Sequence, residues 1–190
     1  MKILSYLHIA IFSFLFLSCS SKEKTQEDIR TDLIYSLINE ILSDTTIWRS
    51  EKYCLSEVTL LFPDPPNSSV CKFYNDLFNE DDTVNIYQQL ILRREFLIDS
   101  LKIGGMKILS KKDIIVNSKI SDEFFWSYIH ENCERGYISF SMPVFSKDNS
   151  LVYIKFGYMC ERLWGEGESR LYKREDDEWI FIKSPSRWVS

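Results

Sequence analysis

Residues 137–183 read YISFSMPVFSKDNSLVYIKFGYMCERLWGEGESRLYKREDDEWIFIK, and this stretch decides the fold. Apolar and polar side chains alternate from Tyr137 to Val144, which is the period of a strand with one face in a core. The expected strands are Tyr137–Val144, Leu151–Tyr158, Ser169–Lys173 and Trp179–Lys183, joined by turns at Lys147–Ser150, Gly165–Gly167 and Glu175–Glu178. Because short turns make neighbouring strands antiparallel, the stretch predicts an antiparallel meander of about four strands.

Helical spacing precedes this stretch. Six apolar residues share one face of a helix: Leu33, Ile34, Leu37, Ile38, Ile41 and Leu42. This helix is expected from near Thr25 or Glu27 to Ser43 or Trp48, with Thr25–Asp28 resembling a cap. Further expected elements are a second helix at Asp82–Leu101, a strand at Ile114–Val116 and a helical turn at Glu123–His130. The fold class is therefore predicted as α+β, with N-terminal helices packed on a C-terminal antiparallel sheet.

The beginning of the chain has the pattern of an export signal. Lys2 precedes the apolar segment Ile3–Ser18, which is shorter than the roughly 20 residues of a membrane span. The sequence Phe16-Leu17-Ser18-Cys19 resembles the lipobox of bacterial lipoproteins, in which cleavage occurs before an acylated cysteine; Phe16 stands where an aliphatic residue is usual. The resemblance implies that Cys19 carries palmitate and that the protein is attached to a membrane through this N-terminal lipid.

Length and composition indicate how many domains the chain forms and which partners its charge disfavours. With 190 residues, 45% hydrophobic and 15% aromatic, the chain can build one packed domain. We expect a signal peptide at 1–18, a polar tether at 19–28 and a single α+β domain at 29–190. The formal net charge of -5 argues against a dedicated nucleic-acid binder, because phosphate contacts need a basic face.

Four cysteines follow Cys19: Cys54, Cys71, Cys133 and Cys160. An even number in an exported protein favours disulfides, and four cysteines allow three pairings. We favour the pairs that are neighbours in the chain, Cys54 with Cys71 and Cys133 with Cys160. Buried free thiols are the alternative. A zinc site is not expected, because no cysteine pair has C-x2-C spacing.

A longer pattern surrounds the predicted strands. It comprises Gly136–Ser146 (GYISFSMPVFS), Leu151–Tyr153, Cys160, Gly165–Gly167, Trp179 and Trp188. Together with the lipobox, this pattern resembles a group of small uncharacterised lipoproteins of Gram-negative bacteria, and the resemblance covers residues 124–190. It implies a similar fold and a location in the bacterial cell envelope, with the lipid anchor in the outer membrane and the protein on its periplasmic or surface side.

The sequence contains few signs of catalysis. His130 and Cys133 could form a base and a thiol nucleophile, but they sit close together at a turn. The acidic runs Glu80–Asp82 and Glu175–Glu178 lack calcium-loop spacing and are expected to be solvated turns or a helix cap. Hydrolase, P-loop and metalloprotease motifs are missing. We therefore expect no enzymatic activity, no metal and no cofactor.

Aromatic residues are the candidate binding groups. The four singled out are Trp126, Tyr158, Trp164 and Trp188, because rings offer large stacking faces with few rotatable bonds. The expected function is a non-catalytic binding or interaction module of the cell envelope. The alternatives are an accessory envelope protein that acts through a protein partner and, more remotely, a hydrolytic enzyme. A concave aromatic pocket would favour a small ligand, whereas a flat apolar patch would favour a protein.

Overall fold

The computed structural model describes residues 24–44, 47, 53–59, 68–92, 96–162 and 164–189. The predicted signal peptide and Cys19 lie outside these residues. The chain divides into two compact units, residues 1–32 and residues 33–190. Of the first unit, the structure describes only the start of helix α2, and the second contains the sheet.

Helix α2 (Gln26–Ser43) confirms the first predicted helix and begins inside the expected tether. In the first unit, the Thr25 hydroxyl accepts a hydrogen bond from the Asp28 amide, and the Asp28 carboxylate accepts one from the Thr25 amide. This reciprocal capping satisfies two amides that the helix itself leaves unpaired. In the second unit, Leu33, Leu37 and Ile41 on the apolar face are buried, as the spacing predicts.

The sheet is mixed, so the prediction of four antiparallel strands was wrong. Its strands are β1 (Cys54–Ser56), β2 (Ile108–Leu109), β3 (Tyr137–Phe140), β4 (Val144–Phe145), β5 (Leu151–Glu161), β6 (Trp164–Glu175) and β7 (Glu178–Val189). The order is β2-β1-β3-β5-β6-β7, and β4 pairs with β5. Strand β1 runs parallel to both β2 and β3, whereas β3, β5, β6 and β7 are antiparallel neighbours. The two added strands are too short to show any period in the sequence.

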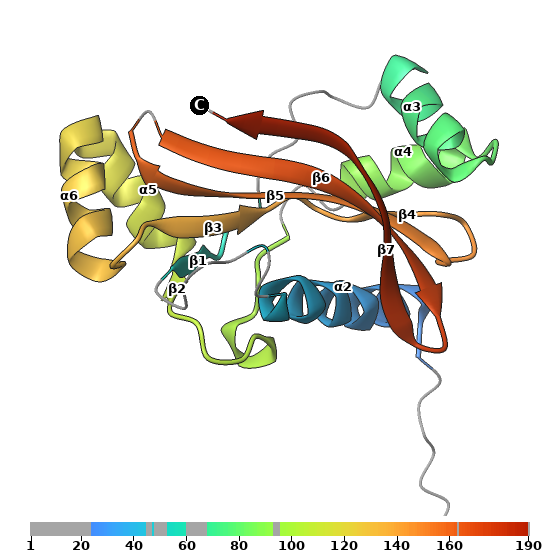
Figure 1. Ribbon diagram of the computed structural model, residues 1–190, viewed down its shortest axis with the longest axis horizontal. Coiled ribbons are helices and arrows are strands. Elements are labelled where there is room, and N and C mark those ends of the chain that lie inside the picture. Colours follow the sequence, from blue (N-terminus) through green and yellow to red (C-terminus); the bar gives the residue numbers. More distant parts are fainter. Residues whose placement is uncertain are drawn as a thin grey trace, which may run out of the picture. The chain divides into compact units, whose positions relative to one another are not determined.

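Helices also lie between the strands, which corrects the expectation that they are N-terminal only. They are α3 (Ser68–Phe78), α4 (Thr83–Leu92), the 3-10 turn η1 (Ser100–Lys102), α5 (Lys111–Ile120) and α6 (Asp122–Asn132). The predicted helix at 82–101 is thus shorter, and the predicted strand at 114–116 lies inside α5, whose first turn is capped by Ser110. The helical turn at 123–130 is confirmed as α6. Figure 1 shows α5 and α6 at one end of the sheet and α3 and α4 toward the other.

The turns explain how the long strands are placed. Asp176 and Asp177 both have positive φ (48° and 68°), the conformation that a two-residue hairpin turn requires, so the predicted turn at 175–178 is confirmed. Gly165–Gly167 was expected to be a turn, but it lies inside β6. The β5–β6 hairpin instead reverses between Glu161 and Trp164, next to a register shift after Met159. The pairing of Tyr137 with Met159 places the end of the hairpin beside the start of β3.

The sheet has two faces, named here from the helices beside them. Side chains alternate along a strand, so the register puts Ile138, Tyr158 and Glu166 on one face and Tyr137, Gly157 and Gly167 on the other. The first is the α2 face, because Arg170 on it contacts Asp44 at the end of α2. The second is the α6 face, because Tyr137 packs against a cluster that contains Ile129 of α6. Each face therefore has its own hydrophobic cover.

Candidate functional site

One disulfide lies within the described residues, and it joins Cys54 to Cys133 with a Cα–Cα distance of 5.5 Å. The expected pairs, Cys54 with Cys71 and Cys133 with Cys160, were therefore wrong. Cys71 is a buried free thiol and Cys160 is a half-buried one. The prediction that the chain contains a disulfide is confirmed, and the alternative of free thiols holds for the other two cysteines.

The faces of the sheet explain this pairing. Cys54 lies on the α6 face, in the same cluster as Cys133 and Ile129, because α6 ends at Cys133 directly beside β1. Cys160 lies beside the hydroxyl of Tyr53, the residue before Cys54 in the chain. Since neighbouring residues of a strand point to opposite faces, Cys160 lies across the sheet from the disulfide. Cys71 belongs to a different cluster, around Tyr74 and Tyr153.

A cleft of about 380 Å³ opens at the end of the β5–β6 hairpin, where the α2 face meets the turn between α6 and β3. Its aromatic lining is Tyr53, Tyr158 and Trp164, and its polar lining is His130, Glu134, Arg135, Cys160, Glu161 and Glu166, with Ile47 at one side. The volume is within the range of small-molecule sites. The cleft is a concave aromatic pocket with convergent polar groups, and such a pocket favours a small ligand over a protein partner.

The three rings form one continuous wall. The ring centroids of Tyr53 and Tyr158 are 5.2 Å apart, and those of Tyr158 and Trp164 are 6.0 Å apart. Tyr53 is buried at the base, whereas the Trp164 side chain is 52% exposed at the mouth. The wall is thus anchored in the core at one end and open to solvent at the other.

Hydrogen bonds hold the wall in position. The Tyr158 hydroxyl donates to Glu166 Oε1 at 2.6 Å, and Arg187 Nη2 lies 3.5 Å from Glu166 Oε2. Burial, reinforced by this hydrogen bond, raises the pKa of Tyr158, so its hydroxyl stays protonated and donating. Burial also raises the pKa of the Cys160 thiol, although the Tyr53 hydroxyl acts in the opposite direction. The polar groups of the cleft are suited to hydrogen bonding, and its thiol is protonated at neutral pH.

Two of the four predicted aromatics lie elsewhere. Trp126 packs on the α6 face, with its ring centroid 6.2 Å from that of Tyr137 and 5.5 Å from that of Phe125. Trp188 covers Gly157 and Gly167 of the neighbouring strands on the same face. Only Tyr158 and Trp164 meet in the cleft.

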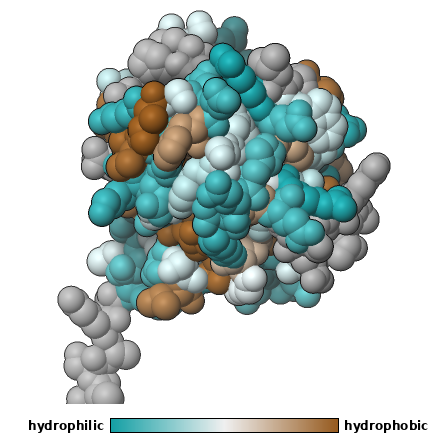
Figure 2. Space-filling model, turned by 90° about the vertical axis from the view of Figure 1, so that its left-hand side faces the viewer, coloured by the Kyte–Doolittle hydropathy of each residue, from teal (hydrophilic) through white to brown (hydrophobic). Residues whose placement is uncertain are grey.

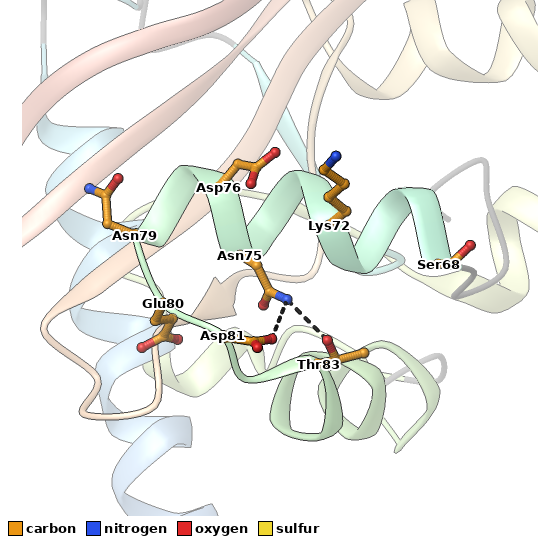
Figure 3. A pocket seen from close by; sticks show the side chains of 8 residues that line it. All are labelled: Ser68, Lys72, Asn75, Asp76, Asn79, Glu80, Asp81 and Thr83. Atoms are coloured by element: carbon orange, nitrogen blue, oxygen red, sulfur yellow. Dashed lines mark hydrogen bonds between the residues drawn. The ribbon is translucent and has the colours of Figure 1, made fainter.

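A second hollow, of about 600 Å³, lies between α3 and the start of α4 and has a polar lining (Figure 3). The side-chain amide of Asn75 donates hydrogen bonds to Asp81 and Thr83, and its oxygen accepts one from the backbone amide of Asp82. The Asp82 carboxylate caps α4 by accepting a hydrogen bond from the backbone amide of Asn85. These polar groups hold the turn between the two helices. The prediction of a helix cap in the run 80–82 is confirmed.

The described residues bear on a metal site and on a catalytic thiol. Among the described residues there is no group of three His, Cys, Asp or Glu side chains placed to hold a metal ion. Because Cys133 is in the disulfide, the hypothesis of a thiol nucleophile beside His130 is wrong. His130 itself is exposed at the rim of the cleft.

The chain matches no protein-family model, no curated protein and no solved structure. Within the described part of the chain, no helix is both long and apolar enough to cross a bilayer. The fold and the cleft are therefore the available guides to function.

Sequence reasoning missed several residues of the cleft. Tyr53 precedes a three-residue strand and carries no pattern of its own, and Glu134 and Arg135 belong to a turn that reads as solvated surface. Glu166 was hidden by the interpretation of Gly165–Gly167 as a turn. One signal was available: Tyr158, Cys160 and Glu166 fall on one face if β5 and β6 are paired through Gly157 and Gly167.

Proposed function

We propose that this protein is a lipid-anchored, non-catalytic binding module of the bacterial cell envelope, and that the cleft at the end of the β5–β6 hairpin is its ligand site. The observation that carries the proposal is the joining of Tyr53, Tyr158 and Trp164 into one wall beside converging polar side chains. Ligand sites combine these two features, because apolar area supplies affinity and a few polar groups supply orientation.

The chemistry of the cleft favours binding over catalysis. A nucleophilic cysteine needs a lowered pKa, whereas burial raises the pKa of Cys160. The half-buried Tyr158 donates its hydroxyl hydrogen bond to Glu166, and that carboxylate also faces Arg187. Such an arrangement fixes side chains in place, which lowers the entropy cost of capturing a ligand.

The proposal is tested by ligand-observed NMR on the full-length protein, with a panel of small neutral, cationic and anionic compounds. The variant Trp164→Ala removes the exposed end of the wall, and Phe124→Ala is the matched control, because Phe124 is an aromatic residue of α6 with similar exposure that does not line the cleft. We expect saturation transfer to at least one compound, lost in Trp164→Ala and kept in Phe124→Ala. A panel without any binder, or binding that is equally strong in Trp164→Ala, would contradict the proposal.

An apolar patch on α5 and α6 favours a second candidate, an accessory protein that acts through a protein partner. Four side chains on these helices are between 39% and 59% exposed: Ile115, Val116, Ile120 and Phe124. On the face of the molecule that carries these helices, hydrophobic residues form small groups among hydrophilic ones (Figure 2). Groups of exposed apolar side chains surrounded by polar residues are typical of protein contacts. Here Val116→Ser with Ile120→Ser, and not Trp164→Ala, would abolish complementation of a deletion strain.

A further inference from the structure

We infer that the cleft binds a neutral sugar ring, with the apolar face of the ring stacked on the exposed Trp164, its edge against Tyr158, and its hydroxyl groups bonded to the charged side chains of the rim. The inference rests on the proposed binding function and names the ligand class for the same site. Three properties of the cleft support it: the form of the aromatic wall, the mixture of donors and acceptors, and the balance of charge.

The first property is that the rings touch one another instead of facing each other across a gap. Tyr158 is in contact with Tyr53 on one side and Trp164 on the other, at centroid distances of 5.2 and 6.0 Å. An ammonium group caged by aromatic faces needs space between those faces, which rings in van der Waals contact do not leave. The exposed ring of Trp164, whose plane is inclined by 60° to that of Tyr158, instead offers one flat apolar surface, which suits the face of C–H groups on a pyranose ring.

The second property is the mixture of polar groups around the wall. Glu134 and Glu161 are acceptors, and Arg135 is a donor with a planar, forked geometry. All three are exposed at the rim, and they belong to the α6–β3 turn and the end of β5. Each sugar hydroxyl both donates and accepts, so a rim that offers both kinds of partner matches a ring of hydroxyl groups better than a ligand with a single charge.

The third property is the balance of charge. Glu134, Glu161 and Glu166 face Arg135 in the cleft, and Arg187 sits 3.5 Å from Glu166. The three carboxylates against these two guanidinium groups leave a small negative excess, which disfavours anionic ligands. The carboxylate nearest the wall, Glu166, is already bonded to Tyr158 and faces Arg187, so it offers little to attract a cation. A neutral ligand fits this environment best.

The test is saturation-transfer NMR and tryptophan fluorescence with methyl glycosides of glucose, galactose and mannose, added to the full-length protein. Glucosamine and glucuronate supply the same ring with a positive or a negative charge, and sorbitol supplies hydroxyl groups without a ring face. Weak binding, with a Kd of about 1 mM, is expected for an unlinked monosaccharide, because few atoms are buried. We expect at least one methyl glycoside to bind, and sorbitol to bind at least about tenfold more weakly.

Variants assign the binding to the cleft. Trp164→Ala should weaken binding of the glycoside by about tenfold or more, Glu161→Gln by a smaller factor, and Phe124→Ala should leave it unchanged. Since Trp164 and Glu161 are exposed, these variants should fold, which circular dichroism would verify.

The outcomes separate the two proposals. If all three methyl glycosides fail to bind, or if sorbitol binds equally well, the sugar inference is overturned. If a charged non-sugar compound from the wider panel then binds and depends on Trp164, the binding function stands with another ligand class. If no compound of any class binds, the proposed function fails as well.

Discussion

Trp188 of β7 lies over Gly167 of β6, its register partner, so closely that a Cβ atom added at Gly167 would come within 2.7 Å of the indole Nε1 and 2.5 Å of the Phe156 carbonyl oxygen. Gly157 on the next strand meets the same indole. Because Gly157 and Gly167 have no side chains, the indole of Trp188 packs directly on the backbone of the α6 face.

Gly167→Ala should therefore destabilise the protein, by about 1–3 kcal/mol, because the contact with backbone cannot be relieved by a side-chain rotation. Gly104→Ala is the control, since nothing lies within 4 Å of the corresponding Cβ position. Urea unfolding of both variants measures the difference. Equal stability of the two would contradict the close packing of Trp188.

Mass mapping under non-reducing conditions should yield a peptide pair joined through Cys54 and Cys133. Cys71 and Cys160 should be alkylated once the protein is unfolded. Because the disulfide spans 79 residues of sequence, its removal in the double variant Cys54→Ala, Cys133→Ala should cost about 4 kcal/mol on the chain-entropy model. Cys160→Ala, which breaks no disulfide, should cost much less. A Cys54–Cys71 peptide would refute this connectivity.

Arg170 should contribute more to stability than a surface arginine. Its side chain is only 15% exposed, with its guanidinium 2.6 Å from Glu168 and 3.3 Å from Asp44 and stacked over Phe181. Arg170→Ala should cost about 2–4 kcal/mol, since it removes the guanidinium group from two partly buried carboxylates. Arg162→Ala, which removes an exposed ion pair to Asp122, should cost about 0–1 kcal/mol. Thermal and urea unfolding would reveal whether the two arginines differ.

Asp148 should make stability depend on pH in the acid range. Hydrogen bonds from the Ser150 amide and the Ser146 hydroxyl lower the pKa of this carboxyl. A carboxyl whose folded pKa is depressed stabilises the fold above its unfolded pKa of about 3.9, and this contribution is lost as the pH falls through the folded value. The gap in unfolding free energy between the wild type and Asp148→Asn should thus be present at about pH 7 and shrink as the pH falls below about 3.9. A gap that does not change with pH would disprove this role.

Palmitate labelling in cells should be lost in Cys19→Ala, because the proposed lipid is attached through that thiol. The variant should accumulate as an unlipidated precursor that keeps residues 1–18, because the proposed cleavage before Cys19 requires that thiol. Cys71→Ala, which removes a thiol of the folded domain, is the control and should be labelled normally. Labelling that persists in Cys19→Ala would show that the lipobox interpretation is wrong.

Local patterns in the sequence determined much of the scaffold. The helical spacing around Leu37 was enough to place α2, and the Asp176–Asp177 turn was enough to place the β6–β7 hairpin. Such features are predictable because the residues that form them are neighbours in the chain, so their periodicity and turn chemistry are visible without knowledge of the rest of the fold.

Tertiary structure alone decided the parallel pairing of β1, the Cys54–Cys133 disulfide and the cleft. Strand β1 has three residues, and its pairing with β3 brings together segments that are about as far apart in sequence as the two cysteines. The same pairing carries Tyr53 to Tyr158 and Cys160, which completes the aromatic wall. Which strands pair, and in which register, depends on how well each arrangement buries the apolar side chains of the whole sheet. The choice among alternative pairings is made by packing across the molecule, and no single local pattern in the sequence encodes it.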